Sequence, residues 1–472
     1  MFEPDAGDAT FEDVRIAVVG GGSRNWATTL VGDLALAGDM SGTVRLYDVD
    51  LESAQANVRL GEQVQSRDDT RGEWSYEAVE TMAAALDGAD VVVCSTQDPP
   101  AKTFKHDLEL PAEYGIVQTV GDTVGPGGTF RAMRAIPQYR EIAATVRECC
   151  PDAWVINYTN PMTVCTRTLY EEFPEINALG VCHEVYHVQS YLADLADKHL
   201  GVEATGEEVD IDVTGINHFT WLTGARVGGR DLTPAIEAEM SEREPIPGGF
   251  EPGDLDEMSV YGGHNLVSFD LYRRFGAYPA AGDRHLAEFV PWYLDVENPE
   301  ALHHWGIKIT PSDYRVDHWP RGEKRRRAYL EGEETVDLGG SGEEMVDIVR
   351  ALLGGETLET NVNLPNEGQA PGLPEGAVVE TNALLTGDAV SPRVGGRLPR
   401  QVASLIETHV HNQETLVEAG FAGDLDLAYR AFLNDPLVTI DPRSARDLFA
   451  DLVEAERPYL EDWKVKDADV LD

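Results

Sequence analysis

Lysine is scarce in this chain: there are seven lysines among 472 residues, whereas aspartate and glutamate together number 84. The formal net charge at pH 7 is −47. Proteins bind duplex nucleic acid through clustered Lys and Arg side chains, so this composition argues against a nucleic-acid partner. Acidic self-repulsion destabilises a compact fold in dilute salt, but at molar salt the Debye length falls to about 3 Å. We therefore expect a halophilic protein. The one basic run, Lys324-Arg-Arg-Arg327, is interpreted as a solvated or subunit-contact segment, with a functional role as the alternative.

Long hydrophobic runs and a signal peptide are also lacking. No stretch approaches the ~20 apolar residues of a membrane span, and residues 1–8 are acidic, without a basic start or an apolar core. We expect a cytoplasmic protein with no membrane partner. The five cysteines make an odd number in a long chain, which argues against a disulfide framework. Most of them are predicted to be buried apolar side chains.

The start of the chain has the pattern of a dinucleotide-binding βαβ unit. Residues 14–19 form a mostly apolar run, three glycines follow at once, and residues 27–37 have helical apolar spacing. Glycines allow the backbone to approach a pyrophosphate, and the helix N-terminus offers free N–H groups. Asp48 ends the next predicted strand, where a carboxylate accepts ribose hydroxyls and disfavours a 2′-phosphate, so NAD is preferred to NADP. A glycine turn without any ligand is the alternative.

Further apolar runs end in polar residues in the same way. Predicted strands at 89–96, 153–157, 178–182 and 209–216 are each followed by polar residues. In a doubly wound sheet, ligands bind at the carboxyl ends of the strands. Residues 125–128 (Gly-Pro-Gly-Gly) are predicted to be a loop, which serves either as a wall of the site or as a plain connection. We predict cofactor contacts for Gly20, Gly22, Ser23, Asn25, Asp48, Thr96 and Asn157.

These patterns predict an α/β fold: a Rossmann-like, doubly wound parallel sheet with an interwoven α+β second lobe. We place an NAD-binding domain at residues 1–195 and a domain for substrate, metal and oligomerisation at 196–472.

Several short motifs together resemble glycoside hydrolase family 4, the NAD- and metal-dependent glycosidases. They run in family order across nearly the whole chain: Gly20-Gly-Gly-Ser23, Val124-Gly-Pro-Gly-Gly-Thr-Phe-Arg131, Asn157-Tyr-Thr-Asn-Pro161, Gly180-Val-Cys-His183, Gly215-Ile-Asn-His218, Asn363-Leu-Pro-Asn-Glu-Gly368 and Asp435-Pro-Leu437. The resemblance implies a divalent metal, usually Mn²⁺, held by Cys182 and His218. A thiolate with an imidazole suits a transition metal; a buried thiol and a core histidine are the alternatives. We also expect a homodimer or homotetramer.

The resemblance implies hydrolysis of a glycoside by C3 oxidation, C2 deprotonation, elimination, water addition and re-reduction. Asp283 is the expected C2 base, with Tyr278 and Tyr261 as substitutes, and a turn or helix-capping aspartate is the alternative for Asp283. His183 is the expected acid, because histidine titrates near neutral pH. Its alternative is a group that orients the metal ligands.

The substrate is expected to be an α-galacturonide, because Cys182-His183-Glu184 and residues 282–289 look most like the uronide-active branch of the family. Arginines hold carboxylates through paired hydrogen bonds, and three fall in presumed cleft segments: Arg131, Arg134 and Arg284. Asn160 is a further substrate-binding candidate, as is Lys105, because Phe104 stands where the family has an arginine. The alternatives are an α-galactoside, a (6-phospho-)α-glucoside, an NAD-dependent hydroxy-acid dehydrogenase, or a sugar or nucleotide sensor without catalysis.

Overall fold

The structure, a computed structural model, describes residues 10–24, 26–97, 103–243, 263–294, 302, 304–338, 344–387 and 389–465. Six parallel strands lie in the order β3-β2-β1-β4-β5-β6. They are β1 (Phe11–Val19), β2 (Met40–Tyr47), β3 (Glu73–Val79), β4 (Val91–Cys94), β5 (Trp154–Asn157) and β6 (Asn177–Gly180). This is the strand order of the Rossmann fold, so the predicted fold class is confirmed.

Helices cover both faces of the parallel strands because successive side chains of a strand point to opposite faces. Ile16 and Val18 of β1 pack in a core with α1 (Trp26–Leu36), α2 (Leu51–Gln65) and α14 (Met345–Leu352). Ala17 and Val19 pack on the other face with α3 (Met82–Leu86), α5 (Gly125–Cys149) and α6 (Met162–Glu172). Since α14 comes from late in the chain, the second lobe is woven into the first.

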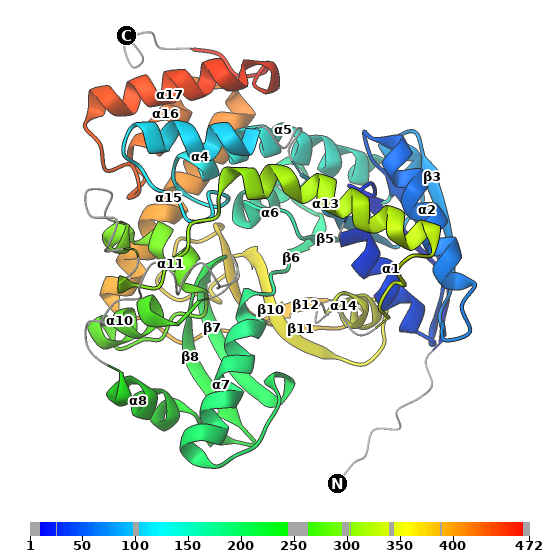
Figure 1. Cartoon of the computed structure of the whole chain (residues 1–472), viewed down its shortest axis with the longest axis horizontal. Helices are drawn as coiled ribbons and strands as arrows, with labels where there is room; N and C mark the ends of the chain where they lie inside the picture. Colours follow the sequence, from blue (N-terminus) through cyan, green and yellow to red (C-terminus); the bar gives the residue numbers. More distant parts are fainter. Residues whose placement is uncertain are drawn as a thin grey trace.

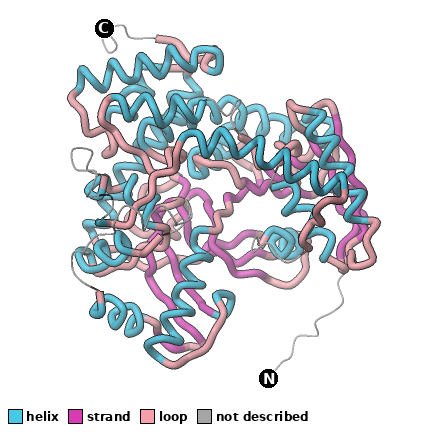
Figure 2. The backbone as a smooth tube through the Cα atoms, viewed as in Figure 1, coloured by secondary structure: helices cyan, strands magenta, loops and turns pink. Residues whose placement is uncertain are grey.

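Antiparallel strands continue the same sheet beyond β6, as the magenta strands of Figure 2 show. They are β7 (Val209–Ile216), β8 (Phe219–Val227), β9 (Arg230–Asp231), β10 (Leu358–Pro365), β11 (Val378–Leu385) and β12 (Val390–Pro392). The junction is the pairing of Asn363 on β10 with Gly180 on β6. One row across the sheet therefore contains Gly180, Asn363, Glu380 and Gly215.

The remaining helices surround this sheet. They are α4 (Thr103–Glu113), α7 (Glu184–Leu200), α8 (Thr233–Glu242), α10 (Leu266–Phe275), α11 (Asp283–Phe289), α13 (Ser312–Glu331), α15 (Arg400–Ala422), α16 (Leu425–Leu433) and α17 (Pro442–Glu456), with 3₁₀ turns η1 (Gly206–Glu208), η2 (Pro291–Tyr293) and η3 (Arg457–Tyr459). In Figure 1, α13 runs over the parallel half of the sheet from α4 to α2. The predicted domain boundary at 195/196 falls inside α7. Among the described residues, no helix has the length and apolarity that a bilayer crossing requires.

One sequence prediction about local structure is wrong. The Gly-Pro-Gly-Gly segment, expected to be a loop, is the first turn of α5. Proline is tolerated there because the first helical N–H groups have no partner within the helix. The glycines allow close packing: a Cβ on Gly128 would lie 2.4 Å from the carbonyl carbon of Thr123, and one on Gly127 would lie 2.7 Å from the oxygen of Gly121. The turn therefore brings segment 119–123 against the helix N-terminus.

Candidate active site

The glycine turn after β1 packs closely against the segments that follow β2 and β4. Gly20 has φ +93°, and a Cβ there would lie 2.1 Å from the carbonyl oxygen of Ser95. A Cβ on Gly22 would lie 2.7 Å from the Asp48 carboxyl carbon, and the Gly22 N–H donates to that carboxylate at 2.8 Å. The Ser23 hydroxyl accepts the N–H of Trp26 at 3.1 Å, which caps the start of α1. Asn25, also predicted to contact the cofactor, lies outside the described residues.

Asn157 ends β5, Thr96 follows the neighbouring strand β4, and the two residues are linked through Thr159. The fully buried Asn157 accepts hydrogen bonds from the Tyr139 hydroxyl at 2.6 Å and the Thr159 N–H at 2.9 Å. The Thr159 hydroxyl in turn accepts the N–H of Thr96 at 2.8 Å. Asn157 thus holds the loop after β5 against the loop after β4. Direct contact of either side chain with a cofactor stays a prediction.

The structure brings Cys182 and His218 together. Cys182 follows β6, His218 is the second residue of the two-residue turn between β7 and β8, and Cys182 Sγ lies 3.4 Å from His218 Nε2. Both side chains are buried. His218 has φ +63°, at a turn position that usually takes glycine. Strained backbone of this kind persists where the surrounding structure fixes it and is enriched at functional sites.

Hydrogen bonds fix the form of the His218 ring. The Thr123 hydroxyl donates its one hydrogen to the Asp122 carboxylate at 2.8 Å and lies 2.9 Å from His218 Nδ1. Nδ1 must therefore carry a proton and donate to Thr123, which leaves a lone pair on Nε2 facing Cys182. Burial, with His285 close by, lowers the pKa of His218 to about 3, so the ring is neutral at physiological pH. A neutral imidazole with a free Nε2 is a metal ligand.

Glu288 supports this arrangement from α11. Its carboxylate is fully buried, and Oε1 accepts the N–H groups of Val120 at 2.7 Å and Gly121 at 2.9 Å. These bonds hold the segment that carries Asp122 and Thr123.

Three residues that sequence reasoning did not assign to the site lie beside the Cys182–His218 pair: His285, Glu184 and Asp122. The rings of His285 and His218 stack with centroids 3.8 Å apart, and ligand atoms of Asp122, His218 and His285 lie within 4.8 Å of one another. His285 Nε2 lies 3.7 Å from the Glu184 carboxylate, which also accepts the Gly282 N–H at 2.9 Å. Burial alone would raise the pKa of Glu184, but His285, His218 and the Gly282 N–H lower it to about 2.

The predicted catalytic residues differ in their surroundings. Asp283 is buried, and its carboxylate accepts the N–H groups of Leu266 at 2.7 Å and Ser268 at 3.0 Å, at the start of α10. Tyr278 is buried, and burial raises the pKa of its hydroxyl well above the ordinary value. His183 is exposed directly before α7. Tyr261 lies outside the described residues. The catalytic roles stay predictions.

Two predicted substrate-binding residues retain unused polar atoms. Arg131 Nε donates to the Asn160 carbonyl at 2.8 Å, while Arg131 Nη1 and Asn160 Oδ1 are buried without a hydrogen-bond partner among the described residues. The Arg131 guanidinium lies 4.9 Å from the centroid of the Phe104 ring. Buried polar atoms of this kind are rare unless a ligand or water satisfies them.

The other predicted cations have protein partners. Arg284 donates to the Thr119 carbonyl at 3.2 Å, and Lys105 lies 2.6 Å from Asp313. Arg134 is buried and pairs with Asp107 at 2.7 Å and with Glu456. Substrate contacts of Arg284 and Lys105 stay predictions, whereas Arg134 is committed to an ion-pair cluster between α4, α5 and α17.

Glu380 is a fully buried carboxylate in the row that leads to Cys182 and His218. Asn361 Nδ2 donates to its Oε1 at 2.6 Å. Burial raises the pKa of Glu380 from the ordinary 4.5 to about 7, against the lowering effect of neighbouring amides. A carboxylate whose pKa is raised in the folded state stabilises the fold below its unfolded pKa and loses that contribution as pH rises through the folded pKa.

We therefore expect Glu380→Gln to remove a pH dependence of stability. Relative to the variant, the free energy of unfolding of the wild type should fall between pH 4.5 and about 7, by an amount on the order of 3 kcal/mol. Urea titrations across this range measure it, and Glu359→Gln, an exposed residue of β10, is the matched control. If the free energies of unfolding of the wild type and of Glu380→Gln changed with pH in parallel, this expectation would be contradicted.

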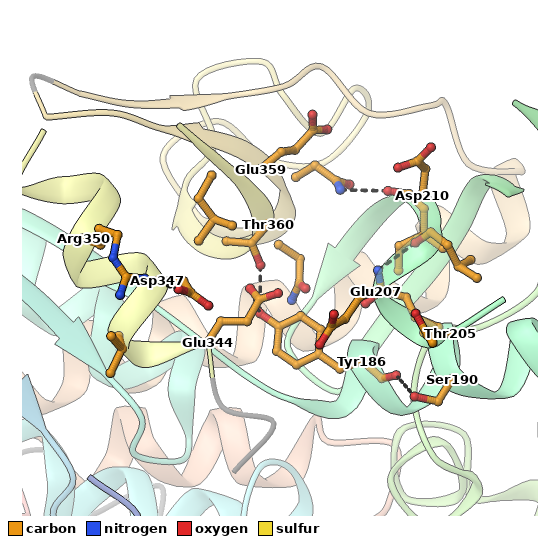
Figure 3. Close-up of a pocket in the computed structure, with 18 of the residues that line it drawn as sticks. Tyr186, Ser190, Thr205, Glu207, Asp210, Glu344, Asp347, Arg350, Glu359 and Thr360 are labelled. Carbon is orange, nitrogen blue, oxygen red and sulfur yellow. Dashed lines mark hydrogen bonds and ion pairs between the residues drawn. The ribbon is translucent and has the colours of Figure 1, made fainter. Parts of the chain in front are cut away.

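A groove of about 1060 Å³ lies elsewhere on the molecule, between α7, β7, α14 and β10. Figure 3 shows Tyr186, Glu344 and Thr360 converging in it, and the Tyr186 hydroxyl donates to Glu344 at 2.7 Å. Carboxylates outnumber cations in its lining, and its three arginines pair with acids of the chain. None of the described site residues predicted from the sequence lines it. The predicted metal ligands lie elsewhere: Cys182 follows β6, and His218 lies in the turn between β7 and β8.

Comparisons with known proteins identify the family of the chain. A model of family 4 glycosyl hydrolases matches residues 15–198, and a model of their C-terminal domain matches residues 213–438. The chain is 45% identical to an alpha-galacturonidase of Thermoanaerobacterium saccharolyticum, over 97% of this chain and 99% of that protein. The crystal structure of lplD from Bacillus subtilis has 43% identity and a TM-score of 0.88, and the match covers 94% of this chain and 100% of that one.

A more distant structure shows the same fold. It is a 6-phospho-alpha-glucosidase from gut microorganisms in complex with NAD and Mn²⁺, with 21% identity and a TM-score of 0.78, over 97% of this chain and 100% of that one. Fold and site together define an enzyme that cleaves glycosidic bonds. The chain belongs to glycoside hydrolase family 4. Relatives in this family bind NAD and Mn²⁺. No comparison supports the halophilic expectation, which stays a prediction.

Proposed function

We propose that this enzyme hydrolyses an α-galacturonide with NAD and a divalent transition metal, Mn²⁺ in the first instance. The observation that carries the proposal is the Cys182–His218 pair, with Sγ 3.4 Å from a neutral Nε2. The pair lies in the same sheet as a glycine turn suited to a dinucleotide. The similarity to alpha-galacturonidases supports the choice of sugar.

The residues present fit both NAD and a divalent metal. Gly20, Gly22 and Ser23 would hold the pyrophosphate, and Asp48 the adenosine ribose. Val49, 89% exposed directly after Asp48, offers an apolar surface to the adenine. Cys182 and His218 would hold the metal, with Asp122 and Glu184 supplying nearby negative charge. When bound, NAD⁺ takes a hydride from a sugar carbon and later returns it, and the metal polarises sugar oxygens.

His285 is the residue that the geometry favours as the C2 base. Its ring stacks on His218, and the Glu184 carboxylate lies 3.7 Å from its Nε2, where a negative charge favours a protonated ring. Asp283 is a weaker choice, because its oxygens already accept hydrogen bonds at the start of α10. The exposed His183 remains the residue proposed to donate a proton to the departing group. In this assignment Asp283 fixes the segment that carries His285.

Arg131 and Asn160 are proposed to bind the sugar. The free Nη1 of Arg131 would donate to the uronate carboxylate, and the free Asn160 Oδ1 would accept a sugar hydroxyl. The stacking of the guanidinium on Phe104 fixes its plane, which favours a planar carboxylate over a neutral CH₂OH group. We also keep the proposals of a homodimer or homotetramer, which light scattering tests, and of a cytoplasmic location.

A panel of substrates tests the function. We expect turnover of an aryl α-galacturonide with NAD⁺ and Mn²⁺ under reducing conditions, exceeding turnover of the α-galactoside by at least about tenfold, because one charge-assisted hydrogen bond distinguishes them. Arg131→Met should remove that preference. Cleavage of the galactoside or a 6-phospho-α-glucoside alone would overturn the choice of sugar. Stoichiometric NADH release would indicate a dehydrogenase instead.

A further inference from the structure

Helix α13 presents one side to the nucleotide-binding segments of the first lobe. Trp319, Glu323 and Arg326 are spaced by four and three residues, so they lie on the same side of the helix. Arg326 belongs to the basic run of the sequence, in which Lys324, Arg325 and Arg327 are exposed. The side chain of Arg326 is only 3% exposed. A buried arginine needs partners, and its partners explain what this helix does.

Arg326 connects α13 to the glycine turn through one asparagine. Its Nη1 donates to Asn57 Oδ1 at 3.2 Å and to the Ser53 carbonyl at 3.1 Å. Asn57 is fully buried on α2, and its Nδ2 donates to the carbonyls of Gly21 and Ser23 at 2.8 Å each. The amide of Asn57 therefore fixes the carbonyls of the turn, and Arg326 fixes the amide. The N–H groups of the turn are held as well, because those of Gly20 and Gly21 donate to the Tyr47 carbonyl at 3.0 and 2.9 Å. The shape of the turn is therefore fixed by contacts of both its carbonyls and its N–H groups.

A second set of contacts joins the same side of α13 to Arg24, the residue after Ser23. Arg24 donates to Glu323 at 3.3 Å and to Asp50 at 2.9 Å, and its guanidinium lies 4.7 Å from the centroid of the Trp319 ring. Glu323 also pairs with Arg326. Trp319 Nε1 donates to Gln97 Oε1, beyond β4, at 2.9 Å.

We propose that α13 organises the dinucleotide site, with Arg326, Asn57 and Glu323 as positioning residues for the bound nucleotide. The inference rests on the proposed NAD dependence and adds residues of the second lobe to the cofactor site. The three segments that α13 joins are the glycine turn, the start of α2 after Asp48, and the segment after β4. In the Rossmann fold these are the segments that surround a dinucleotide. A site fixed before binding loses less conformational entropy on binding, so it holds its ligand more tightly.

NADH binding, measured by fluorescence titration and stopped flow, tests the proposal without substrate or turnover. Arg326→Lys keeps the charge but loses the planar fork that reaches both Asn57 and Ser53. We expect roughly tenfold weaker NADH binding and faster dissociation, comparable to the loss of one charge-assisted hydrogen bond. Glu323→Gln should also weaken NADH binding. Because this side chain is 40% exposed, the substitution carries no risk to folding. Lys324→Gln, on the exposed side of α13, is the control and should bind NADH as the wild type does.

Melting temperatures and one double variant separate positioning from a structural role. If Arg326→Lys and Glu323→Gln lower the melting temperature but bind NADH normally, the contacts are structural and the proposal is wrong. The losses of NADH binding free energy caused by Arg326→Lys and Asn57→Ser should not add in the double variant, because both substitutions act through one contact. Full additivity would show that Arg326 does not act on the glycine turn through Asn57. If the wild type itself fails to bind NADH, the proposed NAD dependence fails, and this inference fails with it.

Discussion

Cys182→Ser is expected to lose its metal and nearly all activity while the protein remains folded. The Cys182 Sγ lies 3.4 Å from His218 Nε2. A serine hydroxyl stays protonated at neutral pH, so it cannot replace a thiolate as a ligand. Lewis-acid stabilisation by a metal amounts to several kcal/mol, so turnover should fall roughly 10³-fold or more. Metal content after dialysis and turnover at saturating Mn²⁺ measure the two effects.

Because Cys182 is buried, metal binding is also expected to depend on pH. Burial, with the carboxylates of Glu380 and Glu184 nearby, raises the pKa of the Cys182 thiol well above its ordinary value. A cation must therefore displace the proton, and metal affinity should increase with pH. Cys149→Ser, the same substitution at a half-buried cysteine of α5, is the control and should retain metal and rate. Wild-type metal content in Cys182→Ser would show that the ligand assignment is wrong.

The parallel half of the sheet could be predicted because its signals are local. β1, the glycine turn and α1 are consecutive in sequence, and buried strands such as β4 appear as continuous apolar runs. The spacing of these apolar runs therefore predicted a Rossmann-like α/β fold. The position of α14 could not be predicted in this way, because its packing on α1 depends on contacts across more than 300 residues.

The site was only partly predictable for the same reason. Cys182 and His218 were found because each belongs to a short motif and follows a strand. Asp122 was missed because residues 125–128, which follow it, were interpreted as a loop. They instead start α5, and their close packing turns the preceding segment toward His218. His285 stands in the 282–289 motif, but nothing local shows that its ring stacks on His218. The partners of Asp283 at the start of α10 are equally non-local.

The His285→Asn variant should lose the chemical step and keep the fold. General-base catalysis typically contributes about 10²- to 10⁴-fold, so kcat should fall by that factor while NADH and metal binding remain. Exchange of the C2 hydrogen of the sugar with solvent deuterium should slow in parallel, because the base carries out that exchange. Asparagine retains a polar group beside Glu184, which limits any loss of stability.

The matched variant is Asp283→Asn, two residues away in sequence. Its carboxylate accepts three hydrogen bonds from the start of α10, so the amide should cost about 1–3 kcal/mol of stability. The effect on kcat, measured well below the melting temperature, should be less than about tenfold. The two positions thus predict opposite patterns: a loss of rate without a loss of stability at His285, and a loss of stability with little loss of rate at Asp283. If Asp283→Asn abolished C2 exchange while melting as the wild type does, Asp283 would be the base, and His285 would act only by orienting His218.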